Sequence, residues 1–183
     1  MRKLVLGLAT AVVATTLSAV SLTEPASAAS STFRDKAGDV SHGGDLRSVR
    51  VVNRAKNLWV TITVRDLVPD PASGVGGALF LDTDGQPGPE YVAVGGFFDG
   101  TDYAVLRTDS WKLRKATERV DCSYRMRLNY QNDTVRFRIG NGCFEAVPGS
   151  GAVRVEVRTS GPAAKSADWL GAARTFSKPV ARG

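Results

Sequence analysis

The chain has 183 residues, of which 43% are apolar, and its formal net charge is +6 at pH 7. This length suits one domain with a hydrophobic core and is short for two. The positive charge is too small to indicate a nucleic-acid-binding protein. One histidine, two cysteines and no glycine–serine nucleophile elbow give little support for nucleophilic catalysis, so we do not expect an enzyme.

Residues 1–28 have the features of a secretory signal peptide. Arg2 and Lys3 precede an apolar run over residues 4–22, and Ala26-Ser27-Ala28 supplies a small-residue cleavage site. A membrane anchor is the alternative, because the run is nearly long enough to cross a bilayer. Its many alanine, threonine and serine residues make it weakly hydrophobic, which favours cleavage. We therefore expect a secreted, extracellular protein of residues 29–183 without membrane insertion. Since the leader carries two basic residues and one acidic residue, its loss lowers the net charge by one, to +5.

The segments after the leader have the two-residue periodicity of β-strands. Residues 29–33 lead into a first strand, and residues 46–53 form a second, with Val49 and Val51 on one face. Residues 57–66 alternate most clearly. One face holds Leu58, Val60, Ile62 and Val64, and the other holds Trp59, Thr61, Thr63 and Arg65. This pattern predicts a half-buried strand of an antiparallel sheet.

Residues 77–94 contain two apolar runs separated by an acidic turn. The first run ends at Asp82 and Asp84, and the second begins after Glu90 and ends near Phe97. The glycines between them permit a tight backbone path, so we expect these three carboxylates at one rim of a sheet. Residues 103–108 form another strand. Residues 111–120 fit either a short strand or an irregular excursion.

Cys122 and Cys143 are expected to form one disulfide, as is usual in exported chains. A two-residue turn at Asn132-Asp133 would place Cys122 opposite Cys143, within disulfide reach. A bulge at residues 140–142 would shift that last pair by one. The same register pairs Tyr130 with Val135, Leu128 with Phe137, and Met126 with Ile139 on one apolar face.

The remaining segments complete an all-β pattern. Val153, Val155 and Val157 alternate with charged residues, a loop holds Asp168-Trp169-Leu170, and residues 174–180 close the sheet. No amphipathic helix of useful length occurs. The predicted fold of residues 29–183 is a single antiparallel β-sandwich, jelly-roll-like, with one disulfide.

Short acidic motifs recur between these strands. They are Asp35-x-x-Gly38-Asp39, Asp45-Leu46-x-x-Val49-x-Val51, Leu81-Asp82-Thr83-Asp84 and Asp168-Trp169. With the long alternating strand, this outline resembles secreted bacterial β-sandwich modules of the carbohydrate-binding family 9-like and DOMON-like group, over most of residues 33–180. The resemblance implies a sandwich that binds carbohydrate or another small ligand, often with Ca²⁺.

The acidic loops offer hard oxygen ligands for Ca²⁺. The candidate ligands are Asp35, Asp39, Asp45, Asp82 and Asp84. The alternative is that aspartate and glycine occur there because both favour turns. The spacing Asp82-x-Asp84-Gly85 is shorter than an EF-hand loop and lacks its flanking helices.

The candidate ligand-binding residues lie on outward faces of strands. Trp59 can stack on a sugar ring, or it can be covered by a loop and belong to a core. Four arginines share the outer face of the cysteine-linked hairpin, where the predicted register sets Arg127 opposite Arg138. They form either an anion-binding patch or an ordinary solvated face. The four are Arg125, Arg127, Arg136 and Arg138.

From these features we expect a secreted, non-catalytic binding module for carbohydrate or an anionic cell-envelope polymer, stabilised by Ca²⁺. We expect it to be a monomer without a nucleic-acid partner. Two alternatives remain open. One is a protein-interaction domain that uses the arginine face, and the other is a glycosidase-like enzyme that uses the acidic rim.

Overall fold

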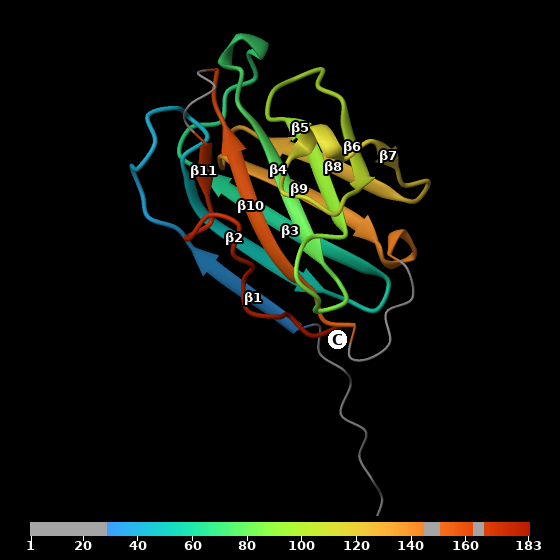
Figure 1. Cartoon of the computed structure of the whole chain (residues 1–183). Coiled ribbons are helices and arrows are strands. Elements are labelled where there is room, and N and C mark those ends of the chain that lie inside the picture. The colour runs from blue at the N-terminus through green and yellow to red at the C-terminus, as the bar shows by residue number, and fades with distance from the viewer. Residues whose placement is uncertain (1–28, 145–150, 163–166) are drawn as a thin grey trace, which may run out of the picture.

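Two antiparallel sheets pack face to face in the computed structural model, which describes residues 29–144, 151–162 and 167–183. Strands β4 and β10 of one sheet pass across β2 and β3 of the other (Figure 1). The described chain contains no α-helix. The predicted antiparallel β-sandwich is therefore confirmed, while the predicted signal peptide lies outside the described residues.

The first sheet has five strands in the order β1-β2-β3-β9-β8. Their bounds are β1 Ala29–Arg34, β2 Leu46–Asn53, β3 Asn57–Val64, β9 Thr134–Gly140 and β8 Tyr124–Asn129. Consecutive strands pair as hairpins, and β3 receives the later β8–β9 hairpin at its free edge.

The second sheet has six strands in the order β11-β10-β4-β5-β6-β7. The segment predicted as ambiguous, residues 111–120, is mostly irregular and ends in the two-residue strand β7. Residues 167–169 form an edge strand where the sequence indicated a loop. The bounds are β11 Ala167–Trp169, β10 Arg154–Ser160, β4 Gly76–Asp82, β5 Tyr91–Gly96, β6 Tyr103–Arg107 and β7 Glu118–Arg119.

The main core lies between the sheets and follows the predicted alternation. All four apolar side chains of β3, Leu58, Val60, Ile62 and Val64, are buried, and they belong to one core cluster with Leu79 of the other sheet. Burying an aliphatic side chain of this size stabilises the fold by about 1.5–3 kcal/mol relative to its exposure. These strands therefore form a rigid support for the residues on their outer faces.

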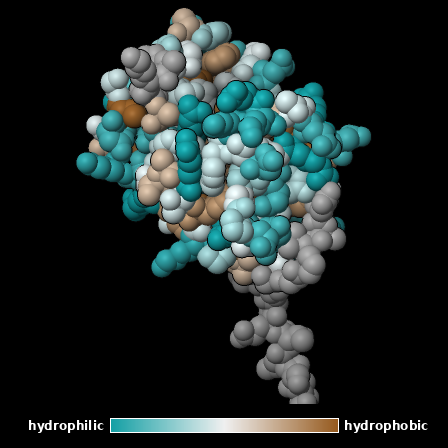
Figure 2. Space-filling model, in the orientation of Figure 1, coloured by the Kyte–Doolittle hydropathy of each residue, from teal (hydrophilic) through white to brown (hydrophobic). Residues whose placement is uncertain are grey.

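A second apolar layer covers the outer face of the six-stranded sheet. Trp111 and Trp169 pack on Phe80 of β4, with ring centroids 5.0 and 6.0 Å away, and Phe176 packs on Trp111 at 4.8 Å. Glu156 of β10 points to this side, as its alternation predicts, yet it is fully buried there. Both tryptophans are therefore structural. Elsewhere on the face that Figure 2 shows, hydrophilic side chains predominate.

The β8–β9 hairpin has a register different from the predicted one. Met126 lies opposite Phe137 and Leu128 opposite Val135, because residues 130–133 form a four-residue turn instead of a two-residue turn. The Asn129 side chain accepts hydrogen bonds from two amides of this turn, and Asp133 adopts a positive φ of 50°. The predicted pairing is thus wrong by two residues, a shift that leaves every side chain on its predicted face.

The disulfide between Cys122 and Cys143 is present, with the two Cα atoms 5.1 Å apart. Neither cysteine lies in the paired strands. The 3₁₀ turn Asn141–Cys143 instead brings the second cysteine back toward the first. A disulfide indicates an oxidising compartment. Among the described residues, no helix is long and apolar enough to cross a membrane.

Candidate functional site

The five predicted Ca²⁺ ligands do not form one site. Asp35 and Asp39 meet Asp168, whereas Asp82 and Asp84 meet Glu90, and within each cluster ligand oxygens lie within 4.8 Å of one another. Asp168 is aligned across β10 with Gly77, five residues before Asp82 on β4. At about 3.3 Å per residue, the two clusters are roughly 16 Å apart along the strand.

Asp45 belongs to neither cluster. Its side chain is fully buried, it accepts hydrogen bonds from the Gly38 amide at 2.9 and 3.1 Å, and it pairs with Arg47 at 3.0 Å. These contacts hold the loop between β1 and β2 in shape. The structure thus gives Asp45 a structural role beside the first cluster.

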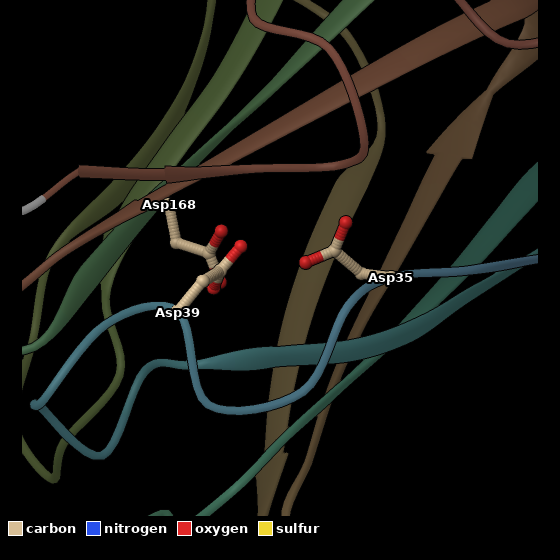
Figure 3. Close-up of side chains that lie close together, drawn as sticks. All are labelled: Asp35, Asp39 and Asp168. Atoms are coloured by element: carbon tan, nitrogen blue, oxygen red, sulfur yellow. The ribbon is translucent and has the colours of Figure 1, made fainter.

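The first cluster joins two distant segments, the loop after β1 and strand β11 (Figure 3). Asp35 and Asp39 both lie in that loop, and Asp168 lies in β11, with the three carboxylates facing a common space. Asp168 accepts a hydrogen bond of 2.6 Å from the Leu46 amide, and Asp35 Oδ1 accepts one of 2.6 Å from the Gly171 amide. The second oxygen of Asp35 is buried without a hydrogen-bond partner.

Burial makes these carboxylates harder to ionise. It raises the pKa of Asp168 to about 6, and the negative charges of Asp35, Asp39 and Asp45 act in the same direction. Burial also raises the pKa of Asp35, against the hydrogen bond from Gly171. Such a cluster of hard oxygens is stabilised when a cation offsets the repulsion. The sequence marked Asp168 only as part of a motif, because its place here depends on the pairing of β11 with β10.

The carboxylates of the second cluster already have partners, most of them amides of the same turn. Asp82 accepts a hydrogen bond from the Gly85 amide at 2.7 Å and forms an ion pair with Arg154. Asp84 accepts from the Gln86 amide at 2.8 Å, and Glu90 accepts from the Thr83 amide at 2.6 Å. Burial raises the pKa of Glu90. Both clusters could hold a metal ion, but among the described residues only this one already has a cationic partner, Arg154, so the first cluster is the stronger candidate.

An open cleft of about 720 Å³ adjoins this turn. Its lining mixes acidic side chains with Arg107 and Lys115, and Arg107 pairs with Glu118 at 3.3 Å. Asp84 and Glu90 line the cleft, so it is where the glycosidase-like alternative would have to act. The acidic residues of the cleft are Asp84, Glu90, Asp109 and Glu118.

All five predicted ligand-binding residues line one hollow of about 200 Å³, here called the arginine hollow. Arg125 lies opposite Arg138 and Arg127 opposite Arg136 across β8 and β9. Trp59 lies opposite Arg138 across β3 and β9. The predicted Arg127–Arg138 pair is wrong because the register differs, but the set of residues gathered on this face is the predicted one.

The arginine side chains of the hollow make few hydrogen bonds within the protein. Arg136 Nε donates to Thr61 Oγ1 and Arg138 Nη2 donates to Ser123 Oγ, both at 3.3 Å. The Nε of Arg138 is buried without a hydrogen-bond partner. In the part of the chain that the structure describes, Arg125 and Arg127 make neither a side-chain hydrogen bond nor an ion pair.

Charge is distributed unequally between the two sheets. The five strands that carry the arginine hollow contain seven arginines and no aspartate or glutamate. The six strands of the other sheet contain four arginines and four acidic residues. A surface with one sign of charge attracts and steers ligands of the opposite sign.

No protein-family model matches this chain, and no curated protein matches it either.

Proposed function

We propose that this protein is a secreted, non-catalytic binding module whose ligand is an acidic carbohydrate or another anionic cell-envelope polymer. The observation that carries this proposal is the segregation of charge, with seven arginines and no acidic residue in the strands of the five-stranded sheet. Guanidinium groups bind carboxylates and phosphates through paired N–H donors. The arginine hollow concentrates four of them at one place.

Trp59 gives the arginine hollow an apolar wall. It is half-buried beside the guanidinium groups, on a strand whose opposite side is anchored in the core. A ring of this kind stacks on the apolar face of a sugar. The combination of a flat ring with cations favours a charged carbohydrate over a plain anion, in agreement with the resemblance to carbohydrate-binding modules. The module acts as a monomer in this proposal.

Ca²⁺ has a structural role in this proposal. The cluster of Asp35, Asp39 and Asp168 fits a cation because it offers three hard carboxylates, one of them with a buried oxygen that lacks a hydrogen-bond partner. These residues would hold the ion between the loop after β1 and strand β11. Bound Ca²⁺ would add a shared partner for charges that otherwise repel each other.

The non-catalytic character is supported by the second acidic cluster. A glycosidase needs one carboxylate that donates a proton and another that stabilises or attacks. Asp82 is paired with Arg154, and Asp84 and Glu90 accept hydrogen bonds from amides of their own turn. Secretion is supported by the leader-like residues 1–28 and by the disulfide.

Retention on immobilised polymers tests the proposed function. We expect the protein to be retained on polygalacturonate and polyphosphate at low salt, to elute as salt rises, and to pass through neutral cellulose. Replacing all four arginines of the hollow by glutamine should abolish retention. The matched control replaces four exposed cations elsewhere, Lys112, Arg114, Lys115 and Lys178. An equal loss in both variants would show that only net charge matters and would contradict the proposal.

A further inference from the structure

The arginine hollow forms a two-by-two array of like charges. The facing pairs Arg125–Arg138 and Arg127–Arg136 are cross-strand neighbours, whose Cβ atoms are typically about 5 Å apart. Along each strand, alternate residues are about 7 Å apart. Four arginine side chains therefore surround one small area, and Trp59 bounds it on the β3 side.

Most of the donors in this array are available to a ligand. Each guanidinium has five N–H groups. Arg136 and Arg138 each use one N–H group in a hydrogen bond of 3.3 Å to a hydroxyl group, and Arg138 keeps a buried Nε without a partner. Since like charges that face each other destabilise a sheet, an occupant with several negative oxygens would relieve this cost.

The charge and shape of the array discriminate between anions. A carboxylate carries one negative charge and two oxygens, which a single guanidinium can satisfy through a paired contact. It would leave the arginines of the opposite strand without compensation. A phosphate monoester carries about −1.5 to −2 charge and three acceptor oxygens that point in different directions. It can accept from β8 and β9 at once.

We infer that the arginine hollow is a subsite for a phosphate monoester carried on a sugar or similar ring, with the phosphate between the facing arginines of β8 and β9 and the ring against Trp59. This inference rests on the proposed function and narrows its ligand class. A hollow of about 200 Å³ is large enough for one such phosphorylated ring. The subsite therefore recognises one phosphorylated sugar unit of the polymer.

Calorimetric titration with four small probes tests the inference. The probes are glucose 6-phosphate, glucuronate, glucose and inorganic phosphate, at a mildly alkaline pH where the phosphate monoester is dianionic. We expect glucose 6-phosphate to bind at least about tenfold more tightly than each of the others. Trp59→Ala should remove the advantage of glucose 6-phosphate over inorganic phosphate and leave the affinity for inorganic phosphate unchanged.

Two double variants locate the site. Arg127→Gln with Arg136→Gln removes one facing pair and should weaken glucose 6-phosphate binding at least about tenfold. Arg34→Gln with Arg50→Gln removes the same charge from exposed positions of the same sheet outside the hollow. This variant should change the affinity by no more than about threefold. Melting curves verify that both variants fold.

The outcomes separate the inference from the proposed function. Equal affinity for glucuronate and glucose 6-phosphate, or no binding of either by a protein that polyanion columns still retain, would overturn the phosphate subsite alone. Inorganic phosphate binding as tightly as glucose 6-phosphate would overturn the role of the ring. Equal loss in the two double variants would overturn the location. Failure of the protein to be retained on any polyanion would overturn the proposed function itself.

Discussion

Among the described residues, Glu156 is the most unusual ionisable group. Replacing it by glutamine tests whether the apolar layer outside the six-stranded sheet holds this side chain in its protonated form. Its side chain is fully buried opposite Phe80 on the outer face of the six-stranded sheet. Oε1 accepts a hydrogen bond of 3.0 Å from the Leu170 amide, but Oε2 has no partner. The nearest arginines on its strand are engaged, Arg154 with Asp82 and Arg158 over the ring of Trp169.

Burial raises the pKa of Glu156 from 4.5 to about 8, despite amide hydrogen bonds that act in the opposite direction. Between these two values the folded protein keeps a proton that the unfolded chain has released. Stability from this group is therefore fully present below pH 4.5 and is lost as the pH rises toward 8. At about 1.4 kcal/mol per pKa unit, the loss is on the order of 5 kcal/mol at most.

Urea unfolding across this pH range measures the effect. Glutamine has nearly the same size and cannot ionise, so Glu156→Gln should match the wild type near pH 5 and exceed it by several kcal/mol near pH 8. Other carboxylates titrate in both proteins and cancel in the difference. Glu118→Gln is the control, because its side chain is 71% exposed. If the wild type and Glu156→Gln keep a constant difference from pH 5 to pH 8, the reasoning about a proton held in the outer layer is wrong.

Three further predictions concern the metal cluster, the arginine hollow and the disulfide. Millimolar Ca²⁺ should raise the melting temperature, with about 2.7 kcal/mol gained at a hundredfold excess over Kd, and Asp168→Asn should abolish this gain while Asp84→Asn preserves it. A melting temperature indifferent to Ca²⁺ and to chelator would contradict the site. Replacing Arg127 and Arg136 by glutamine should leave stability unchanged or slightly higher in urea unfolding, because a facing like-charge pair is removed; a loss above about 1 kcal/mol would contradict this. Reducing the single disulfide should cost about 3 kcal/mol, and reactive thiols in unreduced, denatured protein would contradict its formation.

Sequence alternation alone predicted which residues lie on the same side of each strand. Alternation in β3 identified its buried side chains, and the cysteine count identified the disulfide. It also identified the arginine hollow, although the hairpin register was predicted two residues away from the true one. The side-chain period of a strand is two, so a slip by two residues changes the partners and not the face. The set of residues that share a face is thus determined along each strand, and an error of two residues in the pairing does not change it.

Which distant segments meet can be read only from the folded chain. Asp168 joins Asp35 and Asp39 because β11 pairs with β10 at the edge of a sheet, and the sequence between them carries no signal of that pairing. Glu156 is buried because segments far along the chain fold over an outer face that alternation alone would leave solvated. The sheet with seven arginines and no acids exists because β8 and β9 add to β3 and not to the other sheet. Strand order and loop packing depend on long-range contacts whose free energies are small differences between competing arrangements, and such contacts leave no periodic pattern in the sequence.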